Sequence, residues 1–223
     1  MDAPGARQRA IVVVEGPTRL DGDLTIPAAA RGVVLFAHGA GSSRHSPRNQ
    51  YVAGHLALAG FATLLMDLLT ADEEQVDART RSLRFDIPLL ARRLTAAVDW
   101  LAGNDATAEL PVVTFGASTG AAAALITAAE HPDRVHGVIS RGGRVDLAGD
   151  ALSTISVPVL LIVGGDDPIV IELNKRAATR LGHVQIEIVP GATHLFEEMG
   201  ALDVVIQHAL DALNRWLPPT SVG

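Results

Sequence analysis

The sequence of 223 residues contains no cysteine, which excludes disulfide bonds and metal sites built from thiolates. Aromatic residues make up only 4% of the chain while apolar residues make up 48%, so the core must be aliphatic. No apolar run approaches the roughly 20 residues needed to span a bilayer. Residues 1–9 lack the apolar centre of a secretory signal. These absences predict a cytoplasmic protein that does not enter the membrane.

Acidic residues outnumber basic ones, 25 to 18, which gives a formal net charge of −7, and no basic stripe runs along any predicted helix. A protein that binds nucleic acid needs such a stripe, so nucleic acid is not an expected partner. The length and apolar content suit one well-buried domain over residues 1–223, with flexible tails at 1–9 and 218–223. The expected partner is a small molecule, bound by a monomer or a homodimer.

Apolar strands alternate with helical patterns from Val33 onward, which predicts a mostly parallel sheet between two layers of helices. The expected fold is a three-layer α/β/α sandwich with eight strands. Two antiparallel strands are expected before it, at 10–15 and 24–26, with a turn at 21–23. The charged stretch 70–85 is interpreted as a solvated face or a mobile loop over the site.

The segment Gly116-Ala117-Ser118-Thr119-Gly120 lies between a β-branched run and a stretch rich in helix-forming alanines. A serine on a sharp turn from strand to helix is exposed at the carboxyl end of the sheet. The flanking glycines allow the tight turn and the close approach of the helix. This setting predicts that Ser118 is a nucleophile, with the helix amino terminus available to a developing oxyanion.

A serine hydroxyl needs a base within hydrogen-bond reach and a third group that orients the base. Asp167 and His194 each follow a later strand, so the loops that carry them are expected at the same edge of the sheet as Ser118. Asp166 competes with Asp167 for the role of the acid. Asp67 is a weaker alternative that is better explained as an anchor for its loop.

The oxyanion of such a reaction needs two N–H donors, one of them from the residue after the nucleophile, Thr119. The glycine-rich loop that follows the strand 33–37 supplies the other, and Ala40 is the expected donor. His38 is interpreted as a structural residue that holds this loop.

The motifs His38-Gly39-Ala40-Gly41, Gly116-Ala117-Ser118-Thr119-Gly120, Gly164-Gly165-Asp166-Asp167-Pro168 and Gly191-Ala192-Thr193-His194 resemble those of the α/β-hydrolase superfamily. Their order of Ser, Asp and His is that of an α/β-hydrolase. The similarity is greatest to the dienelactone-hydrolase-like branch, and within it to small serine enzymes that are sometimes fused behind a phosphoribosyltransferase domain. Dienelactone hydrolases proper use a cysteine nucleophile, which this chain lacks. The resemblance implies the α/β-hydrolase fold and hydrolysis of an ester or lactone, but not the dienelactone substrate.

Arg141 and Arg144 flank two glycines just after a predicted strand. One hypothesis is that they clamp an anionic substrate, because a guanidinium pairs well with a carboxylate. The alternative is a structural ion pair or a solvated turn, and it applies equally to Arg44 and Arg48.

The sequence therefore predicts a serine carboxylesterase or lactonase that forms an acyl-enzyme and needs no metal or organic cofactor. Only 17 residues separate Ser140 from Pro158, too few for a helical cap domain, so small esters are the expected substrates. Two rivals stay open. One is a non-catalytic interaction module on the same fold, and the other is an acyltransferase or peptidase with the same catalytic residues.

Overall fold

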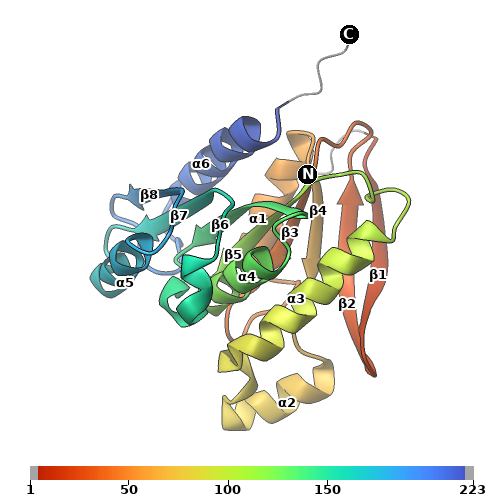
Figure 1. Ribbon diagram of the computed structural model, residues 1–223, viewed down its shortest axis with the longest axis horizontal. Helices are drawn as coiled ribbons and strands as arrows, with labels where there is room; N and C mark the ends of the chain where they lie inside the picture. Colours follow the sequence, from red (N-terminus) through yellow and green to blue (C-terminus); the bar gives the residue numbers. More distant parts are fainter. Residues whose placement is uncertain (1–4, 219–223) are drawn as a thin grey trace.

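The computed structural model describes residues 5–218, which contain one eight-stranded sheet (Figure 1). The strands run in the order β1-β2-β4-β3-β5-β6-β7-β8. The β1–β2 and β2–β4 pairs are antiparallel and all later pairs are parallel. The strand bounds are β1 Arg7–Glu15, β2 Thr18–Ile26, β3 Val33–Ala37, β4 Ala62–Met66, β5 Val112–Ala117, β6 Val135–Arg141, β7 Val159–Gly164 and β8 Val184–Val189.

Helices cover both faces of this sheet (Figure 1). The buried apolar side chains of α3 and α4 pack on one face of the sheet and form one core cluster. Those of α1 and α6 pack on the other face and form a second core cluster. The predicted three-layer α/β/α sandwich is thereby confirmed. The helix bounds are α1 Pro47–Leu58, α2 Ala71–Thr80, α3 Ile87–Ala102, α4 Thr119–Glu130, α5 Pro168–Ala178 and α6 Ala201–Trp216, with 3₁₀ segments η1 Leu83–Phe85 and η2 Val145–Ser153.

The predicted turn at 21–23 is wrong, because these residues lie inside β2. The connection to β1 is made instead at Gly16, where φ is +54°. Gly22 belongs in the strand because a Cβ there would lie 2.9 Å from Ile11 Cδ1 and 3.1 Å from Leu64 Cδ1. Gly22 therefore does not form a bend in the chain. It is needed because the side chains of Ile11 and Leu64 occupy the space that a Cβ would take.

The predicted amino-terminal tail is too long, because β1 begins at Arg7 and pairs with β2 from that residue on. Residues 1–4 and 219–223 of the predicted tails lie outside the described residues.

Within residues 70–85, residues 71–80 form α2 and residues 83–85 form η1. Of the two predicted alternatives, the solvated face describes this stretch, since most of α2 is exposed, and the loop does not. Thr70 and Glu73 form a reciprocal capping box at the start of α2. Glu73 also binds the guanidinium of Arg93, a residue of α3 that is only 2% exposed. These contacts fix α2 against the rest of the molecule.

The connection from β6 to β7 contains only the short η2 segment, as the spacing in the sequence predicts. No helical cap domain is inserted at this point, and the carboxyl ends of the parallel strands are covered by loops and by the α2–η1 segment.

Candidate active site

Ser118 lies between β5 and α4 with φ +50° and ψ −120°, a backbone conformation that residues with a side chain rarely adopt. Hydrogen bonds on both sides hold it there. The Ser118 N–H donates to Arg141 O at 3.3 Å, and Ser118 O accepts from the N–H groups of Ala121 at 3.1 Å and Arg144 at 3.0 Å. Strain of this kind persists only where the surroundings determine it.

The two glycines of the elbow (residues 116–120) are required by close packing. A Cβ on Gly116 would lie 2.3 Å from Ala121 Cα, and one on Gly120 would lie 2.2 Å from Ala37 O. Real Cβ atoms do not approach backbone so closely, so only glycine lets α4 begin against β3 and β5. The packing therefore confirms the prediction that the two glycines allow the helix to approach the strands closely.

His194 follows β8 and its Nδ1 lies 2.7 Å from Asp167 Oδ2. The other oxygen of Asp167 accepts a hydrogen bond from the Val170 N–H at 3.3 Å, so the start of α5 orients the carboxylate. Because an ionised carboxylate only accepts, the Nδ1 of a neutral His194 carries the proton, which leaves Nε2 as the acceptor. Asp166 is exposed and makes no contact of this kind.

Ser118 and His194 line the same cavity, whose volume is about 200 Å³. Within the described residues no hydrogen bond joins the two side chains. Gly142, at φ +54°, permits the approach of the His194 loop, because a Cβ there would lie 3.0 Å from His194 O. The structure thus brings together the three residues predicted from separate loops, with the Ser118 to His194 hydrogen bond not formed.

The predicted oxyanion donors, the N–H groups of Ala40 and Thr119, make no hydrogen bond within residues 5–218. Thr119 is the first residue of α4, where an N–H has no partner inside the helix. The glycine-rich loop lies beside the nucleophile, since a Cβ on Gly39 would be 3.1 Å from Ser118 Cβ. Both donors are therefore free for a ligand near Ser118.

His38 fixes the glycine-rich loop, as the sequence predicts. Its Nε2 accepts from the Leu68 N–H at 2.9 Å and its Nδ1 lies 3.0 Å from Gly39 O. Burial lowers the pKa of His38, although the Gly39 carbonyl and Asp67 oppose the shift. A neutral imidazole with the proton on Nδ1 satisfies both bonds.

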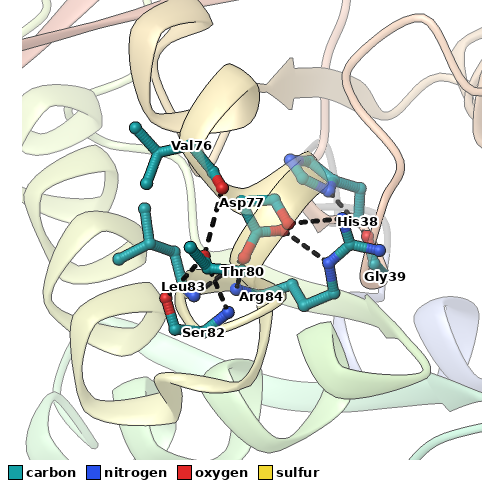
Figure 2. A network of polar contacts seen from close by, with 8 residues as sticks. All are labelled: His38, Gly39, Val76, Asp77, Thr80, Ser82, Leu83 and Arg84. Carbon is teal, nitrogen blue, oxygen red and sulfur yellow. Dashed lines mark hydrogen bonds and ion pairs between the residues drawn. The ribbon is translucent and has the colours of Figure 1, made fainter.

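A second cavity of about 400 Å³ adjoins the first and shares Gly39, Ala40, Ser42 and Ser46 with it. Asp77 and Arg84 of the α2–η1 segment (residues 70–85) line this second cavity, and Figure 2 shows the polar contacts between them. Asp77 accepts from the N–H groups of Leu83 at 2.8 Å and Arg84 at 3.0 Å, and from Arg84 Nε at 2.5 Å.

Arg84 extends this network toward the glycine-rich loop, where a Cβ on Gly41 would lie 3.0 Å from its Nη1. Burial would raise the pKa of Asp77, but the hydrogen bonds and charge of Arg84 and the Leu83 N–H bring it below its ordinary value. The sequence places the charged stretch 70–85 over the site as a solvated face or a mobile loop, but it does not identify helix α2 or the contact of Asp77 with Arg84. The spacing of Thr70 and Glu73 in the sequence is that of a capping box, and it could have predicted the start of α2.

The two arginines predicted to bind substrate differ in their surroundings. Arg144 forms a two-bond ion pair with Asp146, at 2.9 and 2.8 Å, and it does not line the cavity of Ser118. The prediction of a two-arginine clamp is therefore corrected, because the ion-pair alternative describes Arg144. Arg141 is only 6% exposed and lines the cavity. Asp67 anchors its loop by binding the N–H and guanidinium of Arg44.

Across residues 5–218, no three or more His, Asp and Glu side chains are grouped so as to hold a metal ion. The same part of the chain has no helix that combines the length and the apolar character required to cross a membrane.

Residues 20–217 match the model of the dienelactone hydrolase family. The chain belongs to this family. A crystal structure of a dienelactone hydrolase from Anabaena variabilis is 54% identical, with a TM-score of 0.93 over 96% of this chain and 99% of that one. An α/β serine hydrolase without a lid from Xanthomonas campestris is 21% identical, with a TM-score of 0.77 over 96% of this chain and 97% of that one. This more distant likeness shows the fold alone.

A curated relative from Mycobacterium tuberculosis, which carries the name of a phosphoribosyl transferase, is 56% identical over 209 residues. The match covers 93% of this chain but only 46% of the relative, so the chain spans about half the length of the curated relatives it matches.

Proposed function

We propose that this member of the dienelactone hydrolase family is a serine hydrolase that cleaves carboxylic esters or lactones through an acyl-enzyme. The observation that carries the proposal is the 2.7 Å contact of Asp167 with His194, whose imidazole lines the same cavity as the strained Ser118. A serine hydroxyl and an imidazole on one cavity, with a carboxylate bound to the imidazole, are the groups that acyl transfer needs.

In the first half of the reaction, Ser118 Oγ attacks the ester carbonyl and His194 Nε2 takes the hydroxyl proton. Asp167 stabilises the imidazolium that forms, and it stays ionised. The N–H groups of Ala40 and Thr119 donate to the oxyanion of the tetrahedral intermediate. When the intermediate collapses, His194 gives its proton to the leaving alcohol, and the acyl group is left on Ser118.

In the second half, His194 Nε2 removes a proton from water, which attacks the acyl carbonyl and forms a second oxyanion. Collapse releases the carboxylic acid and returns the proton to Ser118 Oγ. In a lactone the leaving alcohol is part of the same molecule, so a single hydroxy acid is the product.

The dimensions of the site favour small substrates. The cavity at Ser118 has about 200 Å³ and the adjoining one about 400 Å³, and residues 5–218 include no cap domain above them to enclose a long chain. We therefore propose small esters or lactones as substrates, and expect a chain-length series of nitrophenyl esters to peak at short acyl groups. A clear preference for long acyl chains would contradict this part of the proposal.

The transferase name of the mycobacterial relative does not alter the proposal. It belongs to a protein of more than twice the matched length, and the matched part is the part that fits the hydrolase family. Acyl transfer to an alcohol or amine would use the same acyl-enzyme. Product analysis with a competing alcohol or amine separates transfer from hydrolysis.

The test is turnover of 4-nitrophenyl acetate by the wild-type protein and by Ser118→Ala. We expect kcat to fall at least ~10³-fold, because the nucleophile is lost while the fold is kept. Ser153→Ala is the matched control, because Ser153 is an exposed residue at the end of η2 that does not line the cavity, and this variant is expected to turn over as the wild type does. Full activity in Ser118→Ala would remove Ser118 from the mechanism, and an inert wild-type protein would favour the interaction module.

A further inference from the structure

Asn174 is a polar side chain of α5 that the fold buries completely. Its exposed fraction is 0%, and the other buried residues of α5 are the apolar Val170 and Ala177. Its Nδ2 donates to two backbone carbonyls, to Val170 O at 2.8 Å and to Gly143 O at 2.9 Å. Because both partners are acceptors, they identify the nitrogen end of the amide. The first bond stays inside α5, whereas the second ties α5 to the β6 turn (residues 141–144).

The β6 turn holds the backbone of the proposed nucleophile. The Ser118 N–H donates to Arg141 O at 3.3 Å, and the Arg144 N–H donates to Ser118 O at 3.0 Å. Gly143 lies between these two contacts and is buried, and among the described residues its carbonyl accepts a hydrogen bond from Asn174 alone. The Asn174 amide is thus a direct link from α5 to the segment that holds Ser118 on both sides.

The β6 turn also lies against the proposed base. A Cβ on Gly142 would be 3.0 Å from His194 O and 3.6 Å from His194 Nδ1. The proposed acid is carried by α5 itself, because Asp167 is its N-cap and accepts from the Val170 N–H at 3.3 Å. Val170 is therefore bound through its N–H to the acid and through its carbonyl to Asn174. One buried amide connects the helix that carries the acid with the turn that contacts the nucleophile and the base.

Stability alone is a poor explanation for an asparagine at this position. A buried amide costs free energy for each hydrogen bond that it fails to make, and Asn174 Oδ1 has no partner among the described residues. A leucine, of similar volume, would avoid that cost but would leave the buried Gly143 carbonyl without its donor. What the amide adds is the bond to Gly143, which fixes α5 against the β6 turn.

We propose that Asn174 is a positioning residue of the hydrolase site, which by binding Gly143 holds the acid and the base in line with the nucleophile. This inference rests on the proposed function and adds to it a residue that lines neither cavity of the site. The structure contains the bond of Asp167 to His194 but no bond of His194 to Ser118. Turnover therefore requires an imidazole that is held within a small range of positions, and loss of the amide widens that range.

The test compares Asn174→Leu, which keeps the volume of the side chain and removes both hydrogen bonds, with Thr107→Val. Thr107 is the matched control, because it is 1% exposed, its Oγ1 also donates to two backbone carbonyls, at 2.7 and 3.3 Å, and it lines neither cavity. Both variants are expected to lose stability, since each leaves carbonyls without a donor. For 4-nitrophenyl acetate we expect kcat per folded protein to fall roughly 10- to 100-fold in Asn174→Leu, with KM changed by less than about twofold, and to be unchanged in Thr107→Val.

Asn174→Thr separates the two bonds of the amide. A threonine hydroxyl in a helix can bind the carbonyl four residues earlier, here that of Val170, but it is shorter than an asparagine amide and does not reach Gly143. We therefore expect Asn174→Thr to lose kcat as Asn174→Leu does, and it serves in place of Asn174→Leu if that variant does not fold. Activity at the level of the wild type in Asn174→Thr would overturn the role of the bond to Gly143.

A proton NMR signal reports the alignment without any substrate. The Nδ1 proton of His194, held by Asp167, is expected at low field, and its absence from His194→Ala identifies it. We expect this resonance to shift or broaden in Asn174→Leu and Asn174→Thr and to be unchanged in Thr107→Val, a result that supports the positioning role even if no ester is hydrolysed. An unaltered resonance in both variants of Asn174, or an equal loss of kcat in Thr107→Val, overturns the positioning role and leaves the hydrolase proposal to the Ser118→Ala test.

Discussion

The elbow and the α2–η1 segment lie on opposite sides of the candidate site and are held in place by different forces. The elbow is fixed by backbone packed against backbone, with two glycines that no larger residue can replace. The α2–η1 segment is fixed by buried charges, through Glu73 with Arg93 and Asp77 with Arg84. We infer that the position of Ser118 is insensitive to pH, whereas the far side of the larger cavity depends on ionised carboxylates.

The largest expected effect is that of Gly120→Ala, whose Cβ would lie 2.2 Å from Ala37 O. Overpacking against backbone cannot relax by a change of rotamer, so we expect a loss of about 3 kcal/mol or more in the free energy of unfolding. Denaturant unfolding measures it. The control is Gly54→Ala in α1, which has no atom within 4 Å of the added Cβ and is expected to gain about 0.5 to 1 kcal/mol. Equal effects at the two positions would contradict the packing argument.

On the other side of the comparison, Asp77→Ala removes the acceptor of three hydrogen bonds in the α2–η1 segment. We expect a loss of about 2 kcal/mol, because the Leu83 N–H and the partly exposed Arg84 lose their partner. The matched control is Glu172→Ala, which breaks the exposed ion pair with Arg176 and is expected to cost less than about 0.5 kcal/mol. If both substitutions cost the same, the network does not hold α2.

A smaller effect is expected at the nucleophile, where the backbone is strained at φ +50°. Ser118→Gly relieves this strain and Ser118→Ala does not, so the glycine variant should be more stable than the alanine variant by about 1 kcal/mol. The difference in unfolding free energy between the two variants tests it. A less stable glycine variant would show that the elbow is not strained.

The smallest expected effect is a local one of pH. The pKa values of Asp77 and Glu73 are lowered in the folded state by arginines and N–H donors that outweigh burial. The stability that these two carboxylates give to the α2–η1 segment is therefore fully present above their unfolded pKa values, about 3.9 for Asp and 4.3 for Glu. It is lost as the pH falls through their lower folded pKa values. Burial raises the pKa of Glu74, which acts in the opposite direction.

Hydrogen exchange followed by mass spectrometry at pH 3 and pH 7, corrected for intrinsic rates, measures this difference. Residues 71–85 should lose protection at pH 3 while residues 112–130 keep theirs. Asp77→Asn should reduce the change with pH. Simultaneous loss of protection in both segments would contradict the comparison.

The same contrast explains what the sequence predicts and what it does not. The motif of the elbow, the strand before it and the helix after it are contiguous in the sequence. The role of Ser118 can therefore be predicted from this local pattern. Asp167 and His194 follow strand ends of a parallel sheet, and topology brings them together. The α2–η1 segment has few apolar residues, and it is fixed by Arg93, 20 residues from its partner Glu73, which no local pattern reveals. The burial of Arg141 on the wall of the cavity likewise follows from the fold and from no local pattern.

The most direct test of the central claim is covalent capture of the nucleophile. The intact protein is incubated with a fluorophosphonate, and mass spectrometry then gives the number and position of adducts. The proposed mechanism predicts one adduct, on Ser118, that forms much more slowly in His194→Ala and is absent from Ser118→Ala. An unlabelled wild-type protein, or an adduct on another residue that persists in Ser118→Ala, would contradict it.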